Sequence, residues 1–216
     1  LGMGVASTKF GSEAYVRGSG EGEAKVVRTA ALITFLVSFP FAAGLFLFSL
    51  PIATLLNMPE HLLSEANIAL KIVSITLVTN FLNLVFNTPQ LSRLRMDLNT
   101  LINAGIRTIG LLAIPVVLSL GGGIIGAVTV VLAISVFTLV GHFLVSSRLL
   151  PELPGVSINK ELIRPLLKFG GALALSVVAA TLLINIEKLV LARVTTAETV
   201  AFYWVAFTLA SMAALF

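Results

Sequence analysis

The 216-residue sequence contains no cysteine, and only 11% of its residues are charged, whereas 57% are hydrophobic. Without cysteine, neither a disulfide framework nor a thiolate metal site can form, and cysteine usage says nothing about the redox compartment. So few charged residues leave too little polar surface to cover a water-soluble globule. The composition therefore excludes a soluble domain and indicates that lipid is the solvent of this protein.

The sequence also lacks the motifs of common catalytic sites. It has no metal-ligand spacing, nucleophile elbow or phosphate-binding glycine loop, and its apolar runs hold too few acids for a paired-carboxylate mechanism. The expected outer loops, about 57–66, 121–123 and 193–198, are short, whereas a membrane glycosyltransferase or polymerase is expected to carry a large polar one. We expect no enzyme, no metal and no cofactor.

What the sequence does contain is a series of long apolar runs. About 20 apolar residues cross a hydrocarbon core about 30 Å thick, and unbroken runs favour helices over the alternating strands of a barrel. The stretch 108–147 lacks Lys, Arg, Asp and Glu and is twice too long, so the glycines at 121–123 are expected to divide it. The sequence predicts about six transmembrane helices, at 29–56, 67–88, 98–120, 124–145, 170–192 and 199–216.

The basic residues predict the orientation of these helices. The formal charge of +4 does not indicate nucleic acid, because Lys and Arg lie between apolar runs rather than on one soluble face. Ten of them fall on one side of the expected membrane, in the segments before the first helix, after the second and between the fourth and fifth. Lys71 and Arg193 lie on the opposite side. Because Lys and Arg are retained in the cytoplasm, both ends of the sequence are expected there.

The segment 157–169 precedes the fifth predicted helix. It places Lys160, Arg164 and Lys168 four residues apart, with apolar residues between them. This pattern predicts an amphipathic helix on the inner membrane interface, with a kink or restart at Pro165.

Polar residues follow one face of the second predicted helix: Thr76, Asn80, Asn83 and Asn87 recur with helical spacing. Lipid does not accept such a face. Two interpretations remain open, namely interhelical hydrogen bonds that hold the bundle together and the wall of a water-filled cavity.

The third predicted helix has a similar face, formed by Thr100, Asn103 and Arg107. Arg107 lies about 14 Å along the helix from Leu98, near the middle of the bilayer. An arginine at that depth normally faces a bundle interior or an aqueous cavity. It is interpreted as a functional residue, with a structural ion pair as the alternative.

Two later helices carry further candidates. Thr181, Asn185 and Lys188 line one face of the fifth predicted helix, with Glu187 beside Lys188, although Lys188 near a helix end is also able to extend to the interface. In the fourth, His142 shares a face with Ser135 and Thr138 but lies close to the inner end, so we expect it at the interface.

Several short motifs occur in a characteristic order. They are LGMGVASTKFGSE at 1–13, RGSGE at 17–21, NMP at 57–59, LKFG at 167–170, NIEKLVL at 185–191 and Tyr203. Their order resembles the MOP superfamily of exporters, and within it the polysaccharide or oligosaccharide flippases. The motif at 185–191 has Glu187 where the family usually has Asp before a basic residue.

The resemblance implies an incomplete all-α polytopic transmembrane bundle, about six helices of a two-lobe protein with twelve or fourteen. Residues 1–28 would be the end of a preceding helix and a cytoplasmic loop, 29–147 four helices of the N-terminal lobe, 148–169 a cytoplasmic inter-lobe linker, and 170–216 two helices of the C-terminal lobe. Such proteins lie in the inner membrane and move polyprenyl-diphosphate-linked sugars across it by alternating access. The residues of the three polar faces would line the translocation cavity, and Glu187 would be a candidate for coupling to H⁺ or Na⁺.

Two other functions remain open. A multidrug exporter of the same superfamily, driven by cation exchange, is expected to have an acidic cavity, whereas Arg107 and Lys188 outnumber Glu187 here. A membrane assembly subunit without transport would use its polar faces only for packing. The expected partners are the lipid-linked oligosaccharide and membrane lipids, without nucleic acid.

Overall fold

The computed structural model describes residues 2–55, 60–155, 157–195 and 197–213, all of which lie in helices or their connections, without a strand. The chain divides into two units, residues 1–172 and 173–216. The first unit contains α1 (Gly2–Val16), α2 (Gly20–Leu47), α3 (Ser49–Leu55), η1 (Glu60–Leu62), α4 (Leu63–Phe86), α5 (Thr88–Ser92), α6 (Met96–Ser119), α7 (Gly123–Leu149), η2 (Lys160–Leu162) and the start of α8 (Ile163–Val194). The second contains the remainder of α8 and α9 (Ala197–Ala213).

The chain is a multi-pass membrane protein of all-α class, as the sequence predicts. Five described helical segments are long and apolar enough to span a membrane, and little of each is buried within the protein. Apolar side chains such as Phe41 and Leu112 are 71% and 69% exposed, which requires a lipid environment. The sixth predicted helix corresponds to α9, whose 17 described residues fall short of the length of the other five.

The glycine turn predicted within 108–147 is confirmed. α6 ends at Ser119 and α7 begins at Gly123, and Gly121 and Gly123 have φ angles of 84° and 55°. Only glycine adopts this left-handed backbone without strain.

Prolines mark two further breaks. The first predicted helix is divided into α2 and α3, because Pro51 lies in the first turn of α3 and has no N–H to continue the hydrogen bonding of α2. Pro89 similarly lies at the start of α5, directly after α4. Pro165 lies in the first turn of α8, where backbone N–H groups have no partner within the helix. The missing N–H of proline therefore removes no hydrogen bond, and the helix runs without interruption from Ile163 to Val194.

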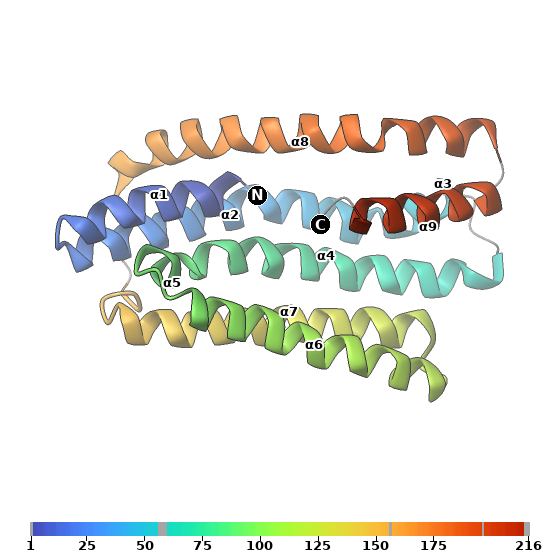
Figure 1. The fold of residues 1–216 in the computed structure, drawn as a ribbon, viewed down its shortest axis with the longest axis horizontal. Coiled ribbons are helices and arrows are strands. Elements are labelled where there is room, and N and C mark those ends of the chain that lie inside the picture. Colours follow the sequence, from blue (N-terminus) through green and yellow to red (C-terminus); the bar gives the residue numbers. More distant parts are fainter. Residues whose placement is uncertain (1, 56–59, 156, 196, 214–216) are drawn as a thin grey trace. The chain divides into compact units, whose positions relative to one another are not determined.

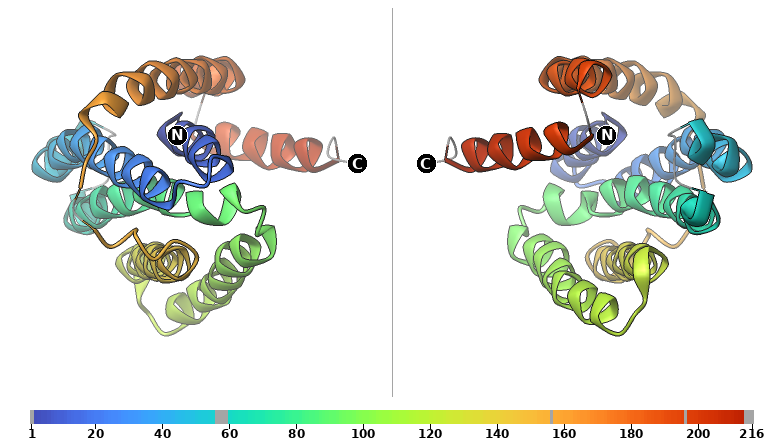
Figure 2. Two further views of the ribbon diagram at one scale, coloured as in Figure 1. Left: turned by 90° about the vertical axis from the view of Figure 1, so that its left-hand side faces the viewer. Right: turned by 90° about the vertical axis from the view of Figure 1, so that its right-hand side faces the viewer.

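In the first unit, α4 packs against α2 and α7, and α7 packs against α6 (Figures 1 and 2). α2 begins at Gly20, nine residues before the predicted helix, because Ser19 caps it by accepting a hydrogen bond from the Gly22 N–H at 3.0 Å. The buried core of this unit consists of small and branched apolar side chains, including Ala6, Ala24 and Val27. Short side chains here let α1 and α2 approach closely.

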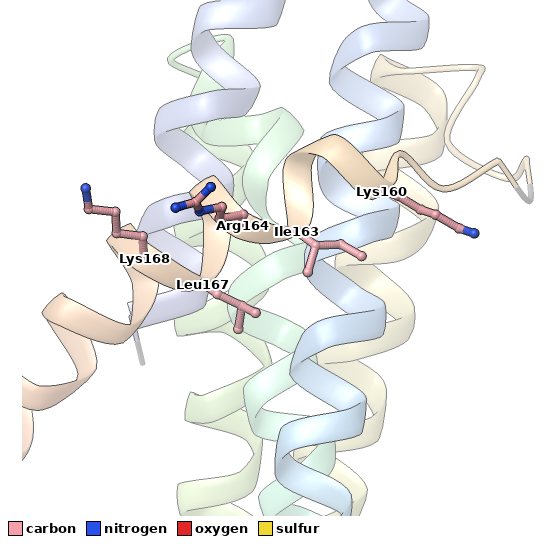
Figure 3. Close-up of a pocket in the computed structure, with 5 residues that line it drawn as sticks. All are labelled: Lys160, Ile163, Arg164, Leu167 and Lys168. Carbon is pink, nitrogen blue, oxygen red and sulfur yellow. The ribbon is translucent and has the colours of Figure 1, made fainter.

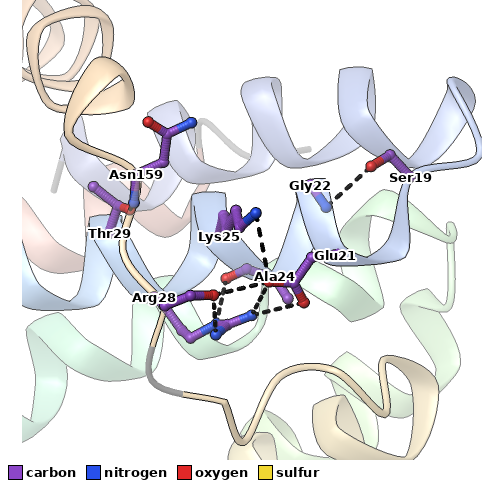
Figure 4. Close-up of polar contacts among 9 residues, drawn as sticks. Ser19, Glu21, Gly22, Ala24, Lys25, Arg28, Thr29 and Asn159 are labelled. Atoms are coloured by element: carbon purple, nitrogen blue, oxygen red, sulfur yellow. Dashed lines mark hydrogen bonds and ion pairs between the residues drawn. The ribbon is translucent and has the colours of Figure 1, made fainter.

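The linker 150–159 is anchored to α2 by polar contacts (Figure 4). Arg28 donates to Ser157 at 2.8 Å and to both oxygens of Glu21 at 3.1 and 3.2 Å. The backbone N–H of Asn159 donates to Thr29 Oγ1 at 3.2 Å. These contacts bring the basic segments around Arg28 and Lys160 to the same end of the first unit, as the predicted topology requires.

Candidate functional site

A pocket of about 550 Å³ lies between α4, α6 and α7. Its polar lining comes from all three helices, and no acidic residue lines it among those that the structure describes. The lining residues are Asn80, Phe81, Asn83, Leu84, Asn103, Arg107, Leu111, Ile114, Val131, Ile134, Ser135 and Thr138. The structure therefore brings four of the predicted cavity residues together, namely Asn80, Asn83, Asn103 and Arg107.

The α4 wall of this pocket is hydrogen-bonded to α7. Asn80 Oδ1 accepts from Ser135 Oγ at 2.7 Å, and Asn83 Nδ2 donates to the Ser135 carbonyl at 3.2 Å. Asn83 Oδ1 is buried and has no hydrogen-bond partner among the described residues. The two interpretations of the α4 polar face are thus compatible, because the same amides join α4 to α7 and line the pocket.

Arg107 lines the pocket from α6, and its side chain is exposed. It makes no hydrogen bond or ion pair with any side chain in the described part of the chain. The alternative of a structural ion pair therefore has no partner in that part. A guanidinium without a carboxylate partner, on a wall free of acids, favours an anionic ligand.

His142 corrects an expectation from the sequence. It is not at the interface but buried, with only 1% of its surface exposed. Its Nδ1 lies 3.1 Å from Gln90 Oε1, and its Nε2 lies 3.4 Å from Asn103 Oδ1. Gln90, which the sequence did not single out, is also buried and links α5 to α7. The approach of α5 to α7 explains the burial, because it covers the helix face that carries His142.

Three predicted cavity residues of the first unit lie outside the pocket. Thr76 is buried and donates to the Ile72 carbonyl at 3.0 Å, Asn87 joins α4 to α5, and Thr100 is exposed on α6. Thr181 and Asn185 belong to the second unit, where Asn185 Nδ2 donates to the Thr181 carbonyl at 2.7 Å. The side chains of Glu187 and Lys188 lie outside the described residues.

A second pocket, of about 630 Å³, lies at the start of α8 and is lined by Lys160, Arg164 and Lys168 with Ile163 and Leu167 (Figure 3). The three cations of the predicted amphipathic segment therefore line one surface. Lys160 and Lys168 extend in opposite directions, so their charges do not converge on one point.

A buried ion pair joins α2 to the end of α5. Glu23 is fully buried, and its Oε1 lies 2.7 Å from Arg93 Nη1. Arg93 also lies over the ring of Tyr15 in α1, at 4.6 Å from the ring centroid. Arg93 is one of the basic residues that follow the second predicted helix, and the sequence gives no sign of its partner, because the two residues are 70 positions apart.

Comparison with known proteins bears on the first part of the chain. The family model described as MatE matches residues 1–90, which include α1 to α4 and the α4 wall of the pocket. This part of the chain is therefore similar to the MatE family of membrane transporters in the MOP superfamily. No curated protein and no solved structure matches the chain.

Proposed function

We propose, on the premise of a MOP-type transporter, that this protein moves a lipid-linked oligosaccharide across the inner membrane by alternating access. The observation that carries the proposal is Arg107, a guanidinium in the transmembrane pocket without an anionic partner among the described residues. The diphosphate of a polyprenyl-linked sugar is the part that hydrocarbon rejects most strongly. Arginine binds it through a planar fork of donors.

The rest of the pocket lining suits an amphiphilic substrate. The amides of Asn80, Asn83 and Asn103 are suited to sugar hydroxyl groups, and Leu84, Leu111 and Ile114 offer apolar surface to a lipid chain. A volume of about 550 Å³ is within the ordinary range of ligand pockets. The pocket is large enough for the diphosphate and adjoining sugar, with the lipid tail extending outside.

Four residues of the second unit are assigned roles in the same proposal. Thr181, Asn185 and Lys188 would contact the substrate, and Glu187 would couple its movement to H⁺ or Na⁺. Their support is the helical spacing and the motif at 185–191.

A multidrug exporter of the same superfamily is the second candidate. Its support is the MatE match, which does not depend on the substrate. Such an exporter is expected to bind cationic substrates through acidic pocket residues. The described lining of the α4–α6–α7 pocket contains Arg107 and no acidic residue. Efflux of a lipophilic cationic dye by cells that express the protein, without rescue of polymer export, would favour this candidate.

The proposal is tested by polymer export in cells that lack their native flippase, with the inserted protein quantified in parallel. Arg107→Ala is expected to insert normally and lose export, while Arg107→Lys retains part of it. Arg95→Ala is the matched control, because Arg95 is an exposed arginine at the start of the same helix. Normal export by Arg107→Ala at normal abundance would overturn the proposal, and loss of the inserted protein would favour a structural role.

A further inference from the structure

We propose that His142 is a proton-binding site whose charge state controls the contact between α7 and the pocket helix α6. The geometry around its ring carries this inference, because both ring nitrogens face side-chain oxygens that act only as acceptors. A neutral imidazole has one N–H, so it satisfies only one of two such acceptors. The protonated ring has two and satisfies both.

The first acceptor is Gln90 Oε1, and its orientation is fixed by the other end of the same amide. Gln90 Nε2 donates to the His142 carbonyl at 3.4 Å and to Ser146 Oγ at 3.2 Å. The Ser146 hydroxyl uses its own hydrogen on the Phe86 carbonyl at 2.6 Å, so it accepts from Gln90. Reversing the amide would set its oxygen against the His142 carbonyl, and the oxygen must therefore face Nδ1.

The second acceptor is Asn103 Oδ1, fixed in the same way. Asn103 Nδ2 donates to the Asn99 carbonyl at 3.1 Å and also contacts Asn99 Oδ1. The backbone carbonyl of Asn99 requires a donor, so the amide nitrogen points to Asn99 and the oxygen to His142 Nε2. The Nε2 contact, at 3.4 Å, is longer than the Nδ1 contact at 3.1 Å and is the one next to the pocket. It is the contact that loss of the proton breaks.

No acidic side chain is bonded to this ring in the described residues, and the charges on the surrounding helices are few. α5 carries none, and α7 itself carries Arg148. α4 carries Glu65 and Lys71, and Lys71 is fifteen residues before Phe86, or about 22 Å along the helix. α6 carries Asp97, which pairs with Arg95 at 2.9 Å, and Arg107. The amide oxygens of Gln90 and Asn103 are therefore the groups that favour the charged ring, and they oppose the burial of the side chain, which disfavours it.

Protonation has a direct link to the pocket. When hydronium gives its proton to Nε2, imidazolium and water form, and the new N–H donates to Asn103 Oδ1. Asn103 and Arg107 lie one turn apart on α6 and both line the pocket. The proton adds positive charge beside the anion site, so a proton and an anionic ligand strengthen each other's binding reciprocally. This last step rests on the proposed function, whereas the proton site itself does not.

Magnetic resonance of the histidine ring tests the proposal without a transport assay. The chain has two histidines, so His61→Gln leaves His142 as the single source of imidazole ¹⁵N signals in the purified full chain in lipid nanodiscs. We expect the ring to carry two N–H groups at the acidic end of the pH range in which the protein is folded and one at the neutral end. A single neutral tautomer at every pH at which the protein is folded would overturn the proposal.

A matched pair of variants isolates the role of Asn103. In the His61→Gln background at a pH where half of the ring is protonated, Asn103→Leu is expected to reduce the doubly protonated fraction at least about twofold, because an acceptor for the charged form is lost. Thr100→Leu lies one turn earlier on α6 without a contact to the ring and is expected to leave that fraction unchanged. An equal fraction in Asn103→Leu and Thr100→Leu would contradict the predicted contact.

The movement of α6 is measured with a spin label at Leu101→Cys in this cysteine-free chain. The label is expected to be more mobile at a pH where the ring is neutral than at one where it is protonated, and to lose this difference in His142→Gln. A label at Leu36→Cys, an exposed position on α2, is expected to be insensitive to pH. A pH response that persists in His142→Gln would overturn the proposal. Since none of these measurements involves transport, their failure is distinct from normal export by Arg107→Ala, which would overturn the proposed function alone.

Discussion

The ion pair between Glu23 and Arg93 permits a quantitative prediction for Arg93→Met. The substitution keeps much of the side-chain volume but removes the guanidinium that lies 2.7 Å from the Glu23 carboxylate. Glu23 has no exposed surface, so water cannot replace the lost partner. The variant is therefore expected to contain an uncompensated buried charge between α2 and α5.

Removing one partner of a buried ion pair costs about 3–5 kcal/mol. For a chain of about 150–250 residues, each 1 kcal/mol lowers Tm by about 2–4 °C, so Arg93→Met is expected to lower Tm by about 6–20 °C. The double variant Glu23→Met/Arg93→Met removes both charges and is expected to recover most of that loss.

The assay is thermal unfolding of the purified protein in one detergent, followed by loss of the monodisperse peak in size-exclusion chromatography. Arg95→Met is the matched control, because Arg95 has a similar ion pair with Asp97 at 2.9 Å but both side chains are largely exposed. It is expected to change Tm little. If Arg93→Met were as stable as Arg95→Met, the reasoning from burial would be refuted.

Three further predictions concern packing, orientation and coupling. Gly4→Ala is expected to lower Tm although alanine favours helices, because the new Cβ would lie 2.6 Å from the backbone oxygen of Leu84, whereas Gly171→Ala, with open space around it, serves as the control and should not. In intact cells, an impermeant thiol reagent is expected to label Ala197→Cys and not Gly20→Cys, and the reverse pattern would invert the predicted topology. Glu187→Gln is expected to remove the dependence of transport on an H⁺ or Na⁺ gradient, and a wild-type rate at every gradient would exclude Glu187 from coupling.

The helices were predictable because membrane thickness fixes their length and glycine alone suits the turn at 121–123. The helix breaks at Phe48 and Asn87 were not, since proline in an apolar run is compatible with both a bend and an interruption. The extension of α2 back to Gly20 depends on the cap at Ser19, which the hydropathy pattern does not reveal.

The candidate site was predictable in part. Spacing on one helix identifies a polar face, and that signal found Asn80, Asn83, Asn103 and Arg107. It does not show which helices pack against that face, so it also included Thr100, which lies one turn outside the pocket. Gln90 and His142 are joined across 52 residues of sequence, and a single sequence offers no signal for such a pairing. The feature that pointed to burial was the helix face that His142 shares with Ser135 and Thr138, all three of which are buried.

The central claim is that the pocket between α4, α6 and α7 is an aqueous path for an anionic substrate, and thiol accessibility at two adjacent positions tests it most directly. Leu111 lines the pocket and Leu112 does not, while the two are similarly exposed, at 61% and 69%, and lie at the same depth in α6. A water-soluble thiol reagent is expected to label Leu111→Cys in membranes and to spare Leu112→Cys, which would face lipid. Added polyprenyl-diphosphate sugar is expected to slow labelling of Leu111→Cys, and this protection is expected to disappear in Leu111→Cys/Arg107→Ala. Equal labelling at both positions, or protection that survives the loss of Arg107, would contradict the claim.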